Sequence, residues 1–251
     1  MHPDIQLRCG DRTFPQIQAI VFDKDGTLGR SEAFLLKLVD QRLACLVEQF
    51  GPIDKAPLRR SWGLTPFGGL SPLGLMAVGS RRDNEIATAA FLAGERPWMA
   101  TVEQVSAAFQ SASDAFPERG PLTPLQEGIR PLLERLETTG IKLAIVSADR
   151  TENVIEFAQW HRIDHHFDLL LGAQPDLPKP DGRLLEMVCC DRLGVLPRHT
   201  LVIGDSSADI NLALNGGAAG AIGVTWCWPE AYELPGADVM LDRVEDIEVL
   251  T

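Results

Sequence analysis

The stretch IQAIVFDKDGTL, residues 17–28, joins a short run of apolar and β-branched residues to a polar turn. An apolar run of this length that ends in a turn signal predicts a buried β-strand. Two carboxylates, Asp23 and Asp25, stand at its end with Lys24 between them. These aspartates either form a turn or take part in chemistry at the end of the strand.

The C-terminal half shows a regular alternation of strand and helix patterns. Further strands are predicted at residues 141–147, 167–172, 199–205, 218–226 and 237–241. Helices are predicted at residues 125–140, 151–161, 182–194 and 207–217. Strands that alternate with helices pair in parallel through right-handed crossovers. We therefore predict an α/β fold with a doubly wound, Rossmann-like parallel sheet that also contains the strand before Asp23.

A long segment separates the first strand from this series. Its pattern predicts helices at residues 31–50, 83–93 and 102–116, and an apolar loop rich in Gly and Pro at residues 62–80. A sheet that includes the first strand must accommodate this segment as an insertion. We predict a core made of residues 1–28 and 122–251, and an inserted helical cap at residues 29–121.

Composition and charge exclude several classes of protein. The chain has 251 residues, 45% of them hydrophobic, and a formal net charge of −12. The acidic balance argues against nucleic-acid binding, which requires a basic face. A membrane span is not expected, because no run of about 18 apolar residues occurs. The absence of a signal-like start, and an odd number of cysteines without a CxxC pair, indicate a cytoplasmic protein with reduced thiols.

Polar side chains follow the ends of three predicted strands. They are Asp23, Asp25 and Thr27 after the first strand, Ser147 after the second, and Asp205 and Asp209 after the strand at 199–205, with Lys179 in a preceding loop. Each residue alone is typical of a turn or a helix N-cap. Ligands of open parallel sheets, however, bind outside the carboxyl ends of the strands, where these side chains would gather.

The gathered residue types point to a metal and a phosphoryl group. Several carboxylates at close range repel one another unless a cation neutralises them. Hard oxygen ligands in incomplete number suit Mg²⁺, which shares its coordination shell with substrate phosphate oxygens. Hydroxyls and a lysine supply the donors and the positive charge that hold and polarise a phosphoryl group.

Four motifs in this order resemble those of the haloacid dehalogenase-like superfamily. They are DKDGTL at residues 23–28, Ser147 at a strand end, Lys179 followed by Pro180, and GDSSAD at residues 204–209. The match covers the whole predicted core. The block inserted after the first motif resembles the helical cap of the subgroup that includes phosphoglycolate phosphatases and β-phosphoglucomutases.

The resemblance implies a role for each matching residue. Asp23 would be the nucleophile and form an aspartyl-phosphate, and Asp25 would be the general acid and then the general base. Thr27, Ser147 and Lys179 would bind the phosphate, and Lys179 would also act as a catalytic residue that balances the charge around Asp23.

The same resemblance implies a set of magnesium ligands. Mg²⁺ would be held by the Asp23 carboxylate, the Asp25 backbone carbonyl and Asp205. Asp209 would be a further ligand or would orient the ligands.

Two features depart from the family pattern. Lys24 stands where the family more often has an apolar residue, and it either forms an ion pair with an acidic neighbour or adds positive charge that changes the affinity for anions. The inserted segment matches no cap signature that we identify. Its Arg81 and Arg82 are candidates for selecting a substrate carboxylate or second phosphate, and the alternative is a solvated helix face.

We therefore predict a Mg²⁺-dependent phosphatase that hydrolyses a small phosphorylated metabolite. One alternative is a phosphomutase of the β-phosphoglucomutase type that uses the same aspartyl-phosphate. Another is a receiver-like or non-catalytic signalling module, but a receiver has its lysine after its last functional carboxylate, whereas Lys179 precedes Asp205. Asp25 disfavours a dehalogenase, which needs no acid for an alcohol leaving group. The substrate's identity and the oligomeric state stay open.

Overall fold

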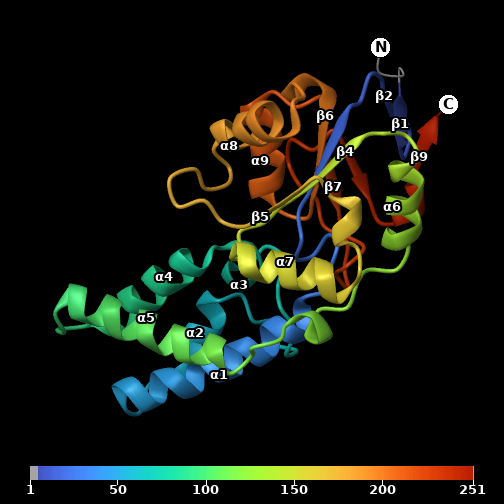
Figure 1. Ribbon diagram of the computed structural model, residues 1–251. Helices are drawn as coiled ribbons and strands as arrows, with labels where there is room; N and C mark the ends of the chain where they lie inside the picture. The colour runs from blue at the N-terminus through green and yellow to red at the C-terminus, as the bar shows by residue number, and fades with distance from the viewer. Residues whose placement is uncertain (1–4, 251) are drawn as a thin grey trace. The chain divides into compact units, whose positions relative to one another are not determined.

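A computed structural model of the protein describes residues 5–250. The chain divides into two compact units. The α/β unit comprises the residues up to Arg30 and those from Thr123 onward, and the helical unit comprises Ser31–Leu122. The strands and helices of both units are labelled in Figure 1, and each unit is described by itself.

A six-stranded parallel sheet forms the centre of the α/β unit, with the strand order β5-β4-β3-β6-β7-β8. The strands are β3 (Ala19–Phe22), β4 (Lys142–Val146), β5 (Leu169–Leu171), β6 (Thr200–Gly204), β7 (Gly220–Val224) and β8 (Val239–Leu241). The predicted doubly wound parallel sheet is confirmed. Its order reverses between β3 and β6, which is where such sheets bind ligands.

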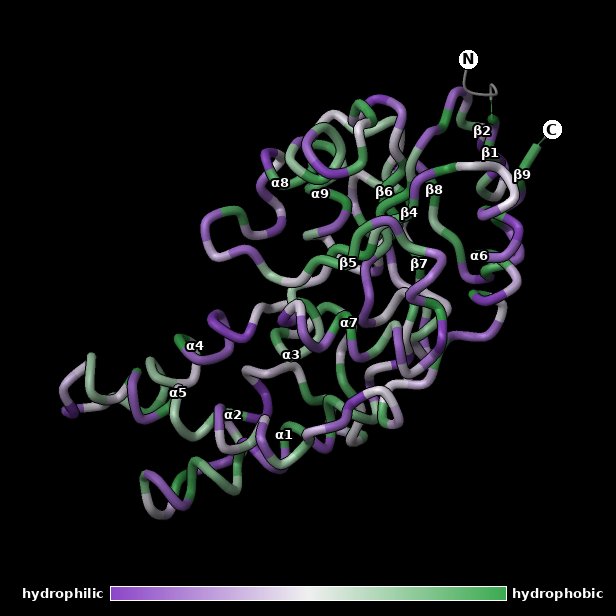
Figure 2. The backbone as a smooth tube through the Cα atoms, in the orientation of Figure 1, coloured by the Kyte–Doolittle hydropathy of each residue, from purple (hydrophilic) through white to green (hydrophobic). Residues whose placement is uncertain are grey.

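Helices cover both faces of this sheet (Figure 1). They are α6 (Ile129–Glu137) and α7 (Thr151–Trp160) on one face, and α8 (Gly182–Glu186) and α9 (Ser207–Gly216) on the other. Successive side chains of a strand point to opposite faces. Phe22 accordingly joins the apolar cluster under α6 and α7, whereas Val21 joins the one under α8 and α9. Figure 2 shows the apolar character of these central strands.

The remaining turns of the α/β unit are short. Helix α8 continues as a π-helical segment, Met187–Leu193, so the helix predicted at residues 182–194 has two parts. Single 3₁₀ turns lie at Asp164–His166, Pro197–His199 and Val244–Asp246. A similar turn, Gly120–Leu122, ends the helical unit.

A second, antiparallel sheet in the α/β unit was not among the predicted elements. Its order is β2-β1-β9, with β1 at Gln6–Cys9, β2 at Arg12–Phe14 and β9 at Ile247–Leu250. Leu7 and Cys9 of β1 and Ile247 of β9 are buried in the same apolar cluster as the residues of α6. The small sheet therefore extends one layer of the core.

The helical unit contains five α-helices within the described residues. They are α1 (Glu32–Phe50), α2 (Lys55–Ser61), α3 (Leu75–Val78), α4 (Arg81–Ala93) and α5 (Trp98–Asp114). Trp62 is fully buried, its ring centroid lies 6.0 Å from that of Phe109, and its Nε1 donates to Thr88 Oγ1 at 3.0 Å. In the described part of the chain, no helix combines the length and apolarity that a bilayer crossing requires.

Candidate active site

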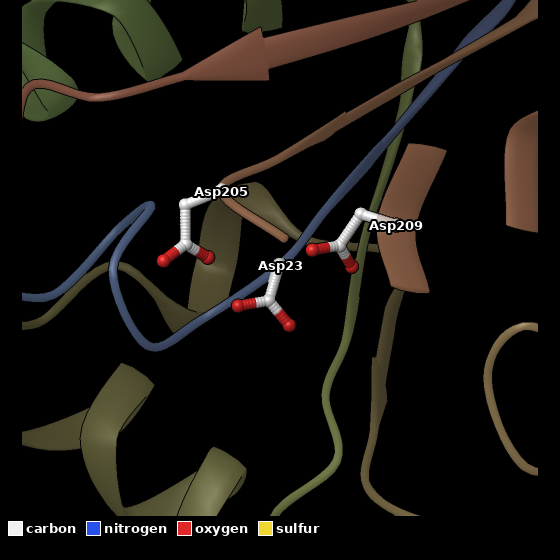
Figure 3. Close-up of side chains that lie close together, drawn as sticks. All are labelled: Asp23, Asp205 and Asp209. Carbon is white, nitrogen blue, oxygen red and sulfur yellow. The ribbon is translucent and has the colours of Figure 1, made fainter. Parts of the chain in front are cut away.

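Three buried carboxylates converge at the point where the sheet order reverses. Asp23 follows β3, Asp205 follows β6 and Asp209 lies in the first turn of α9 (Figure 3). One oxygen of each lies within 4.8 Å of the others. The strand register explains this meeting, because Asp23 donates its backbone N–H to the Ile203 carbonyl at 2.9 Å and so stands beside the end of β6.

The capping box of α9 fixes the Asp209 side chain. Asp209 Oδ2 accepts hydrogen bonds from the Ser206 hydroxyl at 2.6 Å and from the Ser206 backbone N–H at 3.1 Å. A Cβ atom on Gly204 would lie 2.3 Å from Asp209 Cγ, so this approach requires glycine at the end of β6. Asp209 Oδ1 is left for a partner on another element.

That partner is Lys179, which comes from the loop before α8. Its Nζ donates to Asp209 Oδ1 at 2.6 Å and to Asp23 Oδ1 at 2.7 Å. Burial favours the neutral amine, but the carboxylates of Asp209 and Asp23 outweigh it and raise the pKa of Lys179. Lys179 is therefore a fixed cation between two of the three carboxylates.

One lysine does not neutralise the cluster. Burial, opposed by Lys179 and reinforced by Asp209 and Asp25, raises the pKa of Asp23 to about 7. Burial also raises the pKa of Asp205 well above its ordinary range, and Asp23 and Asp209 add to this effect. Both shifts come first from burial of the carboxylates and then from repulsion between them. Hard oxygen donors with excess negative charge fit a divalent cation such as Mg²⁺.

Lys24 forms ion pairs, as one of the two interpretations of this residue predicted. Its Nζ lies 2.6 Å from Asp25 Oδ2 and 3.3 Å from Asp149 Oδ2, and 5.6 Å from the centroid of the Phe157 ring. Burial lowers the pKa of the Lys24 ammonium, but Asp25 and Asp149 outweigh this effect and raise it. Lys24 therefore joins the turn after β3 to the loop after β4.

The two hydroxyls of the motifs lie at the same sheet edge. Thr27 Oγ1 donates to Asp205 Oδ1 at 3.4 Å, and Ser147 Oγ accepts the Asp149 backbone N–H at 3.1 Å. Gly26 has a φ of 82°, and a Cβ there would lie 1.9 Å from Asp205 Oδ2. Thus the turn after β3 packs directly on the Asp205 carboxylate.

The loop at residues 225–232, which we call the aromatic loop, also contacts the site, and sequence reasoning missed it. Trp228 Nε1 donates to Asp205 Oδ2 at 2.8 Å, and the Tyr232 hydroxyl donates to the Asp205 backbone carbonyl at 2.6 Å. Trp226 Nε1 donates to the Thr27 carbonyl at 2.8 Å. The available signal was a pair of tryptophans and the only tyrosine of the chain, placed at the end of a predicted strand and just after it.

The two arginines proposed for substrate selection lie on α4 of the helical unit. The Arg81 guanidinium donates to Glu85 Oε1 at 2.9 Å and to Gln110 Oε1 at 3.0 Å. Arg82 donates to Glu85 Oε2 at 3.3 Å, and its side chain is 63% exposed. The role of Arg81 and Arg82 in selecting a substrate stays a prediction.

A comparison with known families decides the class of protein. Residues 17–217 match the family model described as haloacid dehalogenase-like hydrolase. The chain belongs to this family. It is therefore an enzyme, a hydrolase, and the resemblance carried by the four motifs is confirmed.

Relatives over nearly the whole chain agree with this assignment. The phosphoglycolate phosphatase of Pectobacterium atrosepticum is 28% identical over 233 residues, 92% of this chain and 91% of that protein. The phosphoglycolate phosphatase of Mannheimia succiniciproducens is 29% identical over 227 residues, 89% of this chain and 91% of that protein.

Solved structures of the family share the fold. A Haemophilus somnus protein predicted to be a phosphoglycolate phosphatase aligns with a TM-score of 0.67 and 23% identity, over 92% of this chain and 96% of that one. A Thermotoga maritima protein assigned as a β-phosphoglucomutase aligns with a TM-score of 0.61 and 21% identity over the same shares.

Proposed function

We propose that this hydrolase is a Mg²⁺-dependent phosphatase that cleaves the phosphate monoester of a small metabolite through an aspartyl-phosphate on Asp23. The observation that carries the proposal is the buried cluster of Asp23, Asp205 and Asp209 around Lys179 at the edge of the sheet. The names of the relatives support the reaction class and make phosphoglycolate the first substrate to test.

The residues that would hold Mg²⁺ are the Asp23 carboxylate, the Asp25 backbone carbonyl and Asp205. When bound, the ion would neutralise this cluster and polarise the phosphoryl oxygens. Both oxygens of Asp209 already accept hydrogen bonds, from Ser206 and Lys179. We therefore assign Asp209 to orienting Lys179 and the end of β6, which is the second of the two roles implied for it.

In the first step, Asp23 attacks the phosphorus atom and the ester P–O bond breaks. One oxygen of the Asp23 carboxylate forms the new bond, and Lys179, which donates to Asp23 Oδ1, lies beside it. The electron pair of the broken bond goes to the leaving oxygen, which takes a proton from Asp25. Thr27 and Ser147 donate hydroxyl hydrogen bonds to the phosphoryl oxygens, and Lys179 stabilises the negative charge.

In the second step, water hydrolyses the aspartyl-phosphate. The Asp25 carboxylate takes a proton from the water as its oxygen attacks phosphorus, and the bond to Asp23 breaks. Inorganic phosphate leaves, and the Asp23 carboxylate is restored. A phosphomutase would instead return the phosphoryl group to a sugar phosphate, so the products separate the two activities.

The test is turnover of para-nitrophenyl phosphate with Mg²⁺, followed by a panel of phosphoglycolate, sugar phosphates and nucleotides with analysis of products. We expect inorganic phosphate as the product, loss of turnover in excess chelator, and a loss of about 10⁴-fold or more in Asp23→Asn. Turnover that survives in Asp23→Asn or in excess chelator would contradict the mechanism. An isomerised sugar phosphate would identify a phosphomutase.

A further inference from the structure

The aromatic loop holds Asp205 at two points. Trp228, which is only 8% exposed, donates its indole N–H to Asp205 Oδ2, and Tyr232 donates its hydroxyl to the Asp205 backbone carbonyl. These bonds fix both the side chain and the backbone of a residue that lies at the end of β6. No motif of the family resemblance includes either aromatic residue.

The contact with Trp228 makes the two oxygens of Asp205 different. Oδ2 is enclosed between the indole N–H and Gly26, where a Cβ atom would lie 1.9 Å from it. Oδ1 accepts the longer contact from Thr27 Oγ1 at 3.4 Å. In Figure 3 one oxygen of Asp205 points toward Asp23 and the other points away from it.

An indole is suited to this task because it is a donor and has no acceptor. A hydroxyl in its place could rotate and present a lone pair, whereas the indole N–H always requires an acceptor. Mg²⁺ demands near-ideal geometry from its ligands, so a carboxylate that is held on one oxygen and open on the other is already organised for it. Without its donor, the buried Oδ2 would also lose the short hydrogen bond from the indole.

We propose that Trp228 is a positioning residue for divalent metal binding: it occupies Asp205 Oδ2, leaves Oδ1 as the oxygen that binds the ion, and is assisted by Tyr232. The inference rests on the proposed function for the identity of the metal site. It adds a residue from a loop that the four motifs do not reach. It also makes Trp228 a built-in optical reporter of the metal, since its indole is bonded to a ligand.

The chain offers a matched control in the same loop. Trp226 is also buried, 9% exposed, and its indole N–H donates to the Thr27 carbonyl at the same distance of 2.8 Å. Trp226→Phe and Trp228→Phe therefore remove the same atoms from similar surroundings. Only Trp228→Phe removes a hydrogen bond to Asp205, so a pure packing effect would appear equally in both variants.

The experiment titrates the full-length, chelator-treated protein with MgCl₂ in the absence of substrate, by calorimetry and by tryptophan fluorescence. We expect the Mg²⁺ dissociation constant to rise about 10- to 100-fold in Trp228→Phe. In Trp226→Phe it should be unchanged within error. The fluorescence change on metal binding should disappear in Trp228→Phe and persist in Trp226→Phe.

Tyr232→Phe is a second variant, because it removes one hydroxyl and keeps the ring. It should weaken Mg²⁺ binding less than Trp228→Phe does. If circular dichroism shows that Trp228→Phe does not fold, Tyr232→Phe tests the inference in its place. Metal affinities equal to wild type in folded Trp228→Phe, or in Tyr232→Phe where the first variant is unfolded, would overturn the inference. A wild type that binds Mg²⁺ but hydrolyses no ester overturns the proposed function alone.

Discussion

Two charged clusters, one in each compact unit, are held in different ways. In the α/β unit, the buried Lys179 bridges Asp23 and Asp209, which lie far apart in the sequence. In the helical unit, Arg81 and Arg82 both pair with Glu85 on the same helix. An ion pair whose cation is exposed, as Arg82 is at 63%, contributes only about 0.3–0.5 kcal/mol even though Glu85 is buried, whereas removing one partner of a pair that is buried on both sides costs about 3–5 kcal/mol. Removing a charge should therefore cause a large loss of activity or stability in the α/β unit and only a small change in the helical unit.

Among the substitutions that remove a lysine, Lys179→Met should cause the largest loss of activity. The substitution keeps an unbranched side chain but leaves Asp23 and Asp209 facing each other without a cation. We expect kcat to fall by about 10²- to 10³-fold, as for the loss of one donor that stabilises a transition state. Steady-state kinetics on the best substrate of the panel, with saturating Mg²⁺, measures the effect.

Lys142→Met is the control for Lys179→Met. Lys142 also pairs with a carboxylate, Asp168, at 2.7 Å, but both side chains are partly exposed and lie outside the carboxylate cluster. Its removal should change the free energy of unfolding by less than about 1 kcal/mol and leave kcat as it is. Equal losses of kcat in the two variants would contradict the view that the buried ion pair matters more for activity than the exposed one.

Lys24→Met tests the second buried cation of the α/β unit. It removes the buried ammonium that pairs with both Asp25 and Asp149 at the edge of the sheet. We expect a loss of about 3–5 kcal/mol in the free energy of unfolding, measured by urea denaturation. A fall in kcat of about 10- to 100-fold should accompany it, because Asp25 loses the contact that positions it.

Lys24→Arg and a double variant complete this test. Lys24→Arg keeps the charge and should recover part of both losses. Because Lys24 and Asp149 are in contact, Lys24→Met combined with Asp149→Asn should cost less than the sum of the two single changes. Strict additivity would show that the pair does not act as one unit.

The strand ends could be predicted from the sequence because several local signals agree there. The apolar run before Asp23 and the run before Asp205 each end in a turn, and a parallel sheet brings such ends together. The ion pairs of Lys24 were one of two interpretations, since spacing alone does not reveal Asp149, which follows another strand. The structure shows the ion pair with Asp149 because it brings the two loops into contact.

Other parts of the fold could not be predicted, because their sequences show no periodic pattern. Strands β1, β2 and β9 have only three or four residues each and pair between the two ends of the described chain. The aromatic loop was missed for a related reason. Trp228 and Tyr232 matter through their contacts with Asp205, more than twenty residues earlier, and nothing in the local sequence specifies that partner.

Without a bound metal, the stability of the α/β unit should depend on pH in a defined direction. The pKa of Asp23 in the folded protein is about 7, whereas an aspartate in an unfolded chain has a pKa of about 3.9. The raised pKa means that the folded state holds its proton more tightly. The stabilisation from this proton is complete below about pH 4 and is lost as the pH rises through about 7.

Thermal unfolding in chelator should therefore show a lower midpoint at about pH 8 than at about pH 5.5. Added Mg²⁺ should raise the midpoint more at the higher pH, where it neutralises ionised carboxylates. Asp23→Asn has no proton to lose and should flatten the profile. A midpoint that rises with pH in the metal-free wild type would contradict the raised pKa of Asp23.

Arg82→Ala should have the smallest effect and tests the other side of the comparison. The Arg82 side chain is 63% exposed and shares Glu85 with Arg81, so its loss should change the free energy of unfolding by no more than about 0.5 kcal/mol. If Arg82 binds an anionic group of the substrate, KM should rise in Arg82→Ala for substrates with a carboxylate or a second phosphate, while kcat stays unchanged. Arg81→Ala differs, because it also breaks the bond to Gln110 on α5 and should loosen the helical unit by about 1 kcal/mol. Unchanged selectivity across the panel in both variants would mean that Arg81 and Arg82 belong to a solvated helix face and do not select the substrate.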